Sequence, residues 1–428
     1  MKPVLQVALD MVNGHRALTM AQECLQGGVD WLEAGTPLIK AEGLGILKKM
    51  KQKFDTPLMA DMKILDTGKL ETEIASKSGA DIISVMGMAS DATIKESIKA
   101  AHRYGSKIMV DLMEVKDILK RAREVESLGA DYLCIHVSID EQMKGKQPLE
   151  SITKISQSSS LPLAVAGGLN SETAPVALQK GASIIIVGGA ITKAQNPQEA
   201  AHIIKTSMAQ KKGIRTNLFK KFGEHELLQA FNQVTTSNLC DAMHTQGAMR
   251  GMSPLKLGYR LVGKAVTVET LDGDWAKPVE AIDIAGKSDV IVIQAGPGQR
   301  AVWGELATWS AIKKGIQGVV IEGGLRDIPD IKKTDFPIFY RTISPNAGEP
   351  KGLGETRGEI VCGGQRVRLG DWIIGDDTGV VVVPAREAQE IANRAIHIHE
   401  WENRVREEIK RGGSLNKVLD IKKWEKVL

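Results

Sequence analysis

Short apolar, β-branched segments recur about every 25 residues in the first half of the chain. Amphipathic patterns typical of helices separate them, for example at residues 17–26, 70–77 and 118–128. Several of these helices end at a glycine in Gly-Ala-Asp or Gly-Val-Asp, just before the next strand. Alternating strands and helices predict an α/β domain with a parallel sheet. We expect its strands to begin near Val4, Asp30, Pro57, Asp81, Lys107, Asp131, Leu161 and Ser183.

Eight strand–helix units within about 210 residues are typical of a TIM barrel. A doubly wound open sheet is the structural alternative, and it usually carries G-x-G-x-x-G after its first strand. Residues 10–16 instead read DMVNGHR, which favours the barrel.

The pattern changes after residue 224, which predicts a second domain. Strands are expected at 261–268, 290–294, 318–321 and 380–383, and a charged helix at about 385–410. A chain of 428 residues usually forms more than one core. We therefore predict a barrel at 1–210, a basic linker at 211–225 with solvated lysines, and a second α/β domain at 226–428 that includes the C-terminal helix.

The composition is that of a globular protein, with 43% hydrophobic and 25% charged residues. A net charge of +4 does not indicate nucleic-acid binding, but it is compatible with phosphorylated metabolites. The four cysteines form no CxxC pair and are expected to be buried reduced thiols. Without a signal-like segment or an apolar run long enough to span a membrane, we expect a cytoplasmic protein.

Polar side chains end five of the predicted barrel strands, where TIM barrels bind substrates. Each alone has an ordinary explanation as a loop cap, a salt bridge or a hydrogen-bonded core residue. Together they favour a ligand site, because burying so many charges without a ligand is costly. The residues are Asp10, Glu33, Asp61, Lys63 with Asp66 just beyond, Asp111 and His136.

Two of these acids and two glycine pairs suggest what the site binds. Glu33 and Asp61 offer the hard oxygen ligands that Mg²⁺ prefers, with Mn²⁺ as the second choice. The glycine pairs after strands seven and eight would let backbone amides approach a phosphate. They are Gly167-Gly168 and Gly188-Gly189.

Several motifs coincide with these strand ends: EAGTPLIKAEG at 33–43, D-x-K-x-x-D at 61–66, AGG at 166–168 and VGGAI at 187–191. With them, residues 1 to about 208 resemble 3-hexulose-6-phosphate synthases of the orotidine-monophosphate-decarboxylase suprafamily. The related 3-keto-L-gulonate-6-phosphate decarboxylases typically have Arg three residues after the strand-six His, where this chain has Ile139. That difference favours the synthase over the decarboxylase. A phosphate-binding barrel without lyase activity is a further alternative.

The resemblance implies a reversible, metal-assisted addition of formaldehyde to ribulose 5-phosphate. Glu33 and Asp61 would hold Mg²⁺ beside the C2 and C3 oxygens of the sugar. His136 would transfer the proton at C1, and Lys63 would place its charge near the enediolate oxygen. Asp10 and Asp111 would position Lys63 and substrate hydroxyls. Asp66 would reach the neighbouring subunit's site, which implies a dimer of barrels.

The second half contains an acid and an Arg-Asp pair at a notable spacing. Twenty residues separate Glu305 from Arg326, which follows an apolar strand and Gly-Gly. Arg can bind a carboxylate in a bidentate manner while Asp327 contacts a metal, although Arg-Asp alone is more typical of a surface salt bridge.

Residues 228–400 resemble the family that unites the regulator of ribonuclease activity A with 4-hydroxy-4-methyl-2-oxoglutarate aldolases, of swivelling β/β/α type. In the family's metal-dependent aldolases, Arg326 would bind a 2-oxo acid, Asp327 the Mg²⁺, and Glu305 would support the metal through water. The family's Gly four residues before the acid is Ala301 here. The domain is thus either a second lyase or a non-catalytic interaction module, and a trimer or larger ring in either case.

Overall fold

The computed structural model describes residues 2–216 and 219–426. They form two compact units. The first contains the residues up to Lys221 together with those from Glu400 onward, and the second is Phe222–His399. The boundary at residue 400 falls within the long helix α17 (Ala388–Lys410). No helix among the described residues is long and apolar enough to span a membrane.

Within residues 2–216, parallel strands β1 to β8 close into an eight-stranded barrel. Each strand begins within two residues of its predicted start, and the prediction of a TIM barrel is confirmed. The strands are β1 (Val4–Leu9), β2 (Trp31–Ala34), β3 (Leu58–Ile64), β4 (Ile82–Met86), β5 (Lys107–Asp111), β6 (Tyr132–His136), β7 (Leu163–Ala166) and β8 (Ile184–Val187).

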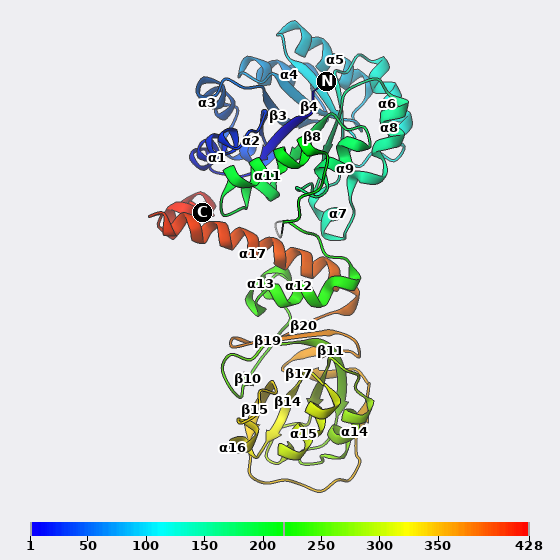
Figure 1. The fold of residues 1–428 in the computed structure, drawn as a ribbon, viewed down its shortest axis with the longest axis vertical. Coiled ribbons are helices and arrows are strands. Elements are labelled where there is room, and N and C mark those ends of the chain that lie inside the picture. Colours follow the sequence, from blue (N-terminus) through cyan, green and yellow to red (C-terminus); the bar gives the residue numbers. More distant parts are fainter. Residues whose placement is uncertain (1, 217–218, 427–428) are drawn as a thin grey trace. The chain divides into compact units, whose positions relative to one another are not determined.

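Helices surround the barrel, as Figure 1 shows. Side chains that alternate along each strand point either outward against these helices or into the barrel, where residues such as Met59, Met109 and Tyr132 form a packed interior. A filled interior leaves the strand ends as the place for a ligand. The helices are α1 (Gly14–Gln26), α2 (Thr36–Glu42), α3 (Gly45–Lys53), α4 (Gly68–Lys77), α5 (Asp91–Arg103), α6 (Ile118–Ser127), α7 (Ile139–Met143), α8 (Ile152–Ser158), α9 (Ala174–Gln179), α10 (Gly189–Thr192) and α11 (Pro197–Gln210).

Strand β3 is irregular where it carries its polar residues. Its register with β4 shifts between Ala60 and Ile64. Lys63 has a φ of 49°, in the left-handed region that non-glycine residues rarely adopt. Such strain persists only where surrounding contacts hold it, and it is common at functional sites.

The second unit is built on one mixed sheet whose strand order is β10-β15-β14-β12-β11-β19-β20-β9, with β13 on β14 and β16 on β11. Helices α14 and α15 pack against one core of this unit, and α12, α13 and the start of α17 cover β19 and β20. The elements are α12 (Leu227–Gln233), α13 (Thr236–Ala242), β9 (Ala248–Met249), β10 (Ser253–Pro254), β11 (Leu261–Glu269), α14 (Ala276–Ile284), β12 (Asp289–Gln294), β13 (Ala301–Trp303), α15 (Glu305–Lys314), β14 (Gly318–Leu325), α16 (Ile328–Ile331), β15 (Ile338–Ile343), β16 (Glu355–Thr356), β17 (Ile360–Cys362), β18 (Gln365–Val367), β19 (Trp372–Asp376) and β20 (Gly379–Val383).

The C-terminal segment belongs to the barrel unit, although the sequence prediction assigned it to the second domain. The reason is a set of ion pairs with the first barrel helix. The buried Arg404 lies 3.5 Å from Glu23, and Arg16 lies 2.8 Å from Glu408. Helix α18 (Leu415–Leu419) follows in the same unit.

The predicted basic linker at 211–225 is likewise divided. Residues up to Lys221 belong to the barrel unit and those from Phe222 to the second unit. Phe219 is only 8% exposed and joins the barrel's hydrophobic core. Part of this segment is therefore packed structure and not a solvated connector.

Candidate active site

The ammonium group of Lys63 lies between two carboxylates at the carboxyl ends of the strands. Its Nζ is 3.0 Å from Oδ2 of Asp61 and 3.6 Å from Oδ2 of Asp111. Burial alone would lower the pKa of Lys63, but these two carboxylates outweigh it and raise that pKa above its usual value. The lysine is therefore held as a cation.

His136 joins this network through Asp111. The Nδ1 of His136 lies 2.8 Å from Oδ2 of Asp111, whose other oxygen accepts the backbone N–H of Met113 at 2.9 Å. Burial opposes ionisation of both groups, but their hydrogen bond prevails, so the pKa of Asp111 is lowered and that of His136 is raised. The pair fixes the orientation of the imidazole ring.

Two further acids complete the mouth of the barrel. Burial raises the pKa of Glu33 well above its usual value, and the nearby Asp61 and Asp10 raise it further. Part of Asp10 is exposed to solvent, but protein surrounds its carboxyl group. Burial of this group, and after it the charge of Asp61, raises the pKa of Asp10 as well. A cation in this region would relieve the repulsion among the three carboxylates.

Three polar residues that the sequence analysis missed hold these carboxylates in place. Ser84 donates to Oδ1 of Asp61 and Thr36 to its Oδ2, both at 2.8 Å. The Nε2 of the fully buried Gln6 donates to Glu33. Gln6 and Ser84 each interrupt an apolar strand with a polar side chain, and that signal in the sequence would have identified them.

The glycine pairs follow β7 and β8 as predicted. Gly167 and Gly168 have φ values of 106° and 71°, and a Cβ on Gly167 would approach the carbonyl of Val137 to 2.6 Å. Gly188 lies beside Asp10, since a Cβ built there would be 3.6 Å from its Oδ2. Both turns therefore lie at the same end of the barrel as the acids.

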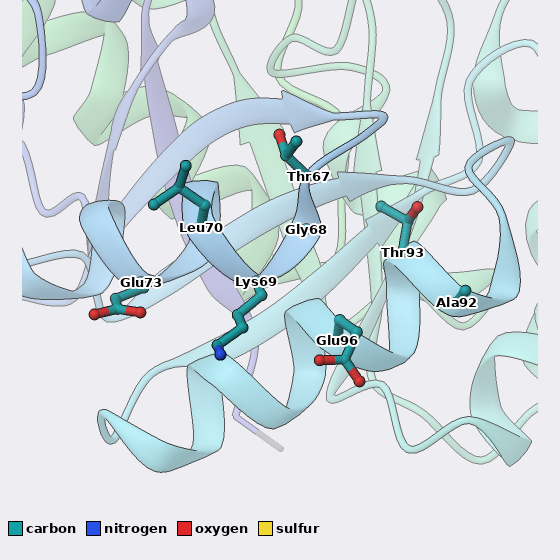
Figure 2. Close-up of a pocket in the computed structure, with 8 residues that line it drawn as sticks. All are labelled: Thr67, Gly68, Lys69, Leu70, Glu73, Ala92, Thr93 and Glu96. Carbon is teal, nitrogen blue, oxygen red and sulfur yellow. The ribbon is translucent and has the colours of Figure 1, made fainter.

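Asp66 is the predicted site residue that does not join this cluster. It follows β3, is exposed, and accepts a hydrogen bond from the backbone N–H of Thr67 at 2.7 Å. Beyond it, the starts of α4 and α5 line an open pocket whose polar residues include Thr67, Thr93 and Glu96 (Figure 2).

In the second unit, the side chains of Arg326 and Asp327 meet at the backbone of Glu305. Asp327 Oδ2 lies 3.4 Å from Nε of Arg326 and accepts the backbone N–H of Glu305 at 3.1 Å. Gly304 permits this approach, since a Cβ there would lie 2.5 Å from the same oxygen. Ala301, the departure from the family pattern, is buried in β13.

A metal ion in either unit would need oxygens from substrate or water. In the described part of the chain, no three His, Cys, Asp or Glu side chains converge closely enough to hold a metal by themselves. Both predicted metal pairs, Glu33 with Asp61 and Glu305 with Asp327, supply two carboxylates each.

Comparison with known proteins assigns both halves. The family described as orotidine 5'-phosphate decarboxylase / HUMPS matches residues 3–204. The 3-hexulose-6-phosphate synthase of Bacillus subtilis is 41% identical over 208 residues, which are 48% of this chain and 99% of that protein. The chain belongs to the orotidine 5'-phosphate decarboxylase / HUMPS family through its first half. The 3-hexulose-6-phosphate synthase of Mycobacterium gastri is 39% identical over 48% of this chain and 99% of its own length.

A crystal structure of the Salmonella typhimurium 3-hexulose-6-phosphate synthase is 34% identical and covers 49% of this chain and 100% of its own, with a TM-score of 0.47. The RraA-like family, described as Aldolase/RraA, matches residues 236–382. The predicted fusion of the two families is therefore confirmed. The relatives of the barrel are carbon–carbon lyases of the aldehyde-lyase type, and the prediction of an enzyme of this class is confirmed at that level.

Asp111→Asn should lower the pKa of His136, because burial would then act on the imidazole without the carboxylate that offsets it. An NMR titration of the imidazole, assigned with His136→Gln, measures this pKa in both proteins. In the native protein the raised pKa means that the pair stabilises the fold below the ordinary histidine pKa, and this contribution is lost as pH rises through the raised value. An unchanged pKa in Asp111→Asn would show that the hydrogen bond is not its cause.

Proposed function

We propose that the barrel adds formaldehyde to C1 of ribulose 5-phosphate to give a 3-hexulose 6-phosphate, and that it also catalyses the reverse reaction. The observation that carries this proposal is the network of Lys63, Asp61, Asp111 and His136 at the barrel mouth. It combines a fixed cation with a fixed imidazole, and the chain spans nearly the full length of relatives named 3-hexulose-6-phosphate synthase.

In the forward reaction, His136 removes a proton from C1 of the ketose and leaves an enediolate. Asp111 fixes the ring through Nδ1, so Nε2 is the nitrogen that accepts this proton. The positive charge of Lys63 stabilises the enediolate oxygen, because it is held in place before the charge develops. C1 then forms a bond to the formaldehyde carbon, and the formaldehyde oxygen takes a proton and becomes the new hydroxyl group.

The carboxylates at the barrel mouth fit a divalent cation. Glu33 and Asp61 would hold Mg²⁺ or Mn²⁺. Burial, and after it repulsion from neighbouring carboxylates, raises the pKa values of Glu33 and Asp10, and a cation would offset both effects. When bound, the metal would polarise the substrate oxygens and make the C1 proton more acidic. Asp10 would orient the sugar hydroxyls.

The third residue after the strand-six histidine supports the synthase in preference to the decarboxylase alternative. Ile139, at the start of α7, occupies the position where the related decarboxylases carry Arg, and its side chain is apolar and 53% exposed. A positive side chain is thus not available at this position to bind a carboxylate.

The barrel is proposed to act as a dimer through the face that Figure 2 shows. Leu70 lines the pocket and is exposed, and Leu65 and Met88, in the segments after β3 and β4, are also exposed. Exposed apolar residues that group together are typical of an interface. Asp66 is exposed and immediately precedes Thr67, which lines the pocket and donates its backbone N–H to Asp66. The free thiols of all four cysteines fit the reducing cytoplasm.

The second unit is proposed to be a lyase for a 2-oxo acid, in a trimer or larger ring. Arg326 would bind the carboxylate, while Asp327 and Glu305 would hold Mg²⁺ directly and through water. The supporting observation is the hydrogen bond from the backbone N–H of Glu305, at the start of α15, to Asp327. The side chain of Arg326 lies beside Asp327. The alternative is a non-catalytic interaction module.

Full-length protein with Mg²⁺ should consume formaldehyde when ribulose 5-phosphate is present, and a chelator should stop the reaction. Asp61→Asn should lower kcat/KM at least about 100-fold, because it weakens both the metal site and the hold on Lys63. Asp55→Asn, at an exposed position, is the matched control and should retain full activity. Full activity in Asp61→Asn would contradict its assigned role.

Two inactive variants should complement each other if Asp66 serves the neighbouring site. Co-refolded or co-expressed Asp61→Asn and Asp66→Asn chains should recover about a quarter of native activity, because half of the random dimers contain one intact site. Activity no higher than that of each variant alone would argue against a shared site.

Oxaloacetate decarboxylation and 4-hydroxy-4-methyl-2-oxoglutarate cleavage test the second unit. Arg326→Ala should lower whichever activity is found by about 100-fold, because the bidentate hold on the carboxylate is lost. Arg366→Ala is the control, since this side chain is 74% exposed and makes only a 3.7 Å ion pair with Glu359. Absence of turnover in the native protein would favour the interaction module.

A further inference from the structure

Described residues that follow the last barrel helix contact the loop after β7 and the glycine turn after β8. These residues, 213–216 and 219–221, are called the strap. The backbone N–H of Ile214 donates to the carbonyl of Ser171 at 3.1 Å, and Ser171 Oγ donates to the carbonyl of Ile214 at 2.7 Å. Farther along, the ring of Phe219 lies directly against Gly189, where a Cβ would overlap it. The strap therefore contacts the loop after β7 and the turn after β8.

Phe219 is held at this position from two sides. Its ring packs into the barrel core, and its backbone N–H donates to Oε1 of Glu400 at 2.6 Å. Its φ of 57° is unfavourable for a residue with a side chain, so these contacts must compensate for the strain. The placement of the ring against Gly189 is thus enforced by the fold of the barrel unit.

Two ammonium groups lie close to this ring. The Nζ of Lys221 is 4.4 Å from the ring centroid, and the Nζ of Lys193, which follows α10, is 5.9 Å from it. The carboxylate of Glu400 interacts electrostatically with both lysines, and its Oε2 is buried without a hydrogen-bond partner among the described residues. With all three groups ionised, two positive charges face one negative charge. The Nζ of Lys221 is buried and has no hydrogen-bond partner among the described residues.

A buried ammonium without a partner is costly, and lysine normally avoids it by extending into water. Burial accordingly lowers the pKa values of both lysines. Burial lowers the pKa of Lys193 to about 7, and the charge of Lys221 contributes to this even though Glu400 opposes it. Burial also lowers the pKa of Lys221 to about 8. A phosphate oxygen beside Lys221 would give its Nζ the hydrogen-bond acceptor that it lacks among the described residues, and its negative charge would favour both ammonium groups.

We propose that Lys221 and Lys193 bind the phosphate group of the sugar phosphate, with Phe219 as a wall of the phosphate pocket and Glu400 as the residue that positions the strap. This inference rests on the proposed function of the barrel. Lys221, Phe219 and Glu400 lie outside residues 3–204, which match the family. Phosphate recognition by the strap would therefore be added to that of the glycine turns.

Binding of inorganic phosphate to the full-length protein tests this directly by calorimetry. Lys221→Met should weaken phosphate binding at least about tenfold and raise the KM for ribulose 5-phosphate by a similar factor, with a smaller change in kcat. Lys221→Arg, which keeps the charge, should recover part of the loss. Lys212→Met, at an exposed position just before the strap, is the matched control and should bind phosphate as the native protein does.

Phosphate binding by Lys221→Met equal to that of the native protein would overturn the inference. If Lys221→Met does not fold, as judged by circular dichroism, Lys193→Met replaces it, and native-like phosphate binding in that variant would overturn the inference equally. Weaker phosphate binding in a protein that does not consume formaldehyde would support the phosphate site and reject only the proposed reaction.

Discussion

Charge balance at the barrel mouth is the constraint on which the site depends. Four carboxylates meet where the strands end, and the ammonium of Lys63 is wedged between Asp61 and Asp111. Asp111 is also bound to His136, so moving the lysine would disturb the imidazole as well. The irregular end of β3 is the structural cost of placing this cation among the acids.

Much of this site follows from the sequence because a parallel barrel brings all its carboxyl ends to one side. Asp10 and His136 are far apart in the chain, yet locating the strands was enough to predict that they share a site. The sequence did not indicate which groups would pair, since a position at a strand end does not determine a side-chain rotamer. The supporting donors Gln6 and Ser84 were missed for a related reason: they lie one layer below the strand ends, inside segments that read as core.

The segments beyond the barrel were harder to predict. A run of lysines is usually solvated, so the burial of Lys221 has no signal in composition. The long helix α17 has a clear periodicity, but periodicity does not reveal which core a helix contacts. That was decided by partners such as Arg404 and Glu23, which are separated by most of the chain. In the second unit, by contrast, Glu305 and Asp327 are linked by one helix and one strand, and their spacing sufficed.

The division of α17 between the two units has a consequence for how the chain is assembled. Because the barrel unit resumes at Glu400, the second unit is an insertion within the barrel unit and not an appendage after it. The first half of the chain, which corresponds to a whole relative, is thus only part of the barrel unit, because that unit also contains the residues from Glu400 onward. The C-terminal segment whose arginines pair with acids of α1 is therefore translated only after the whole of the second unit.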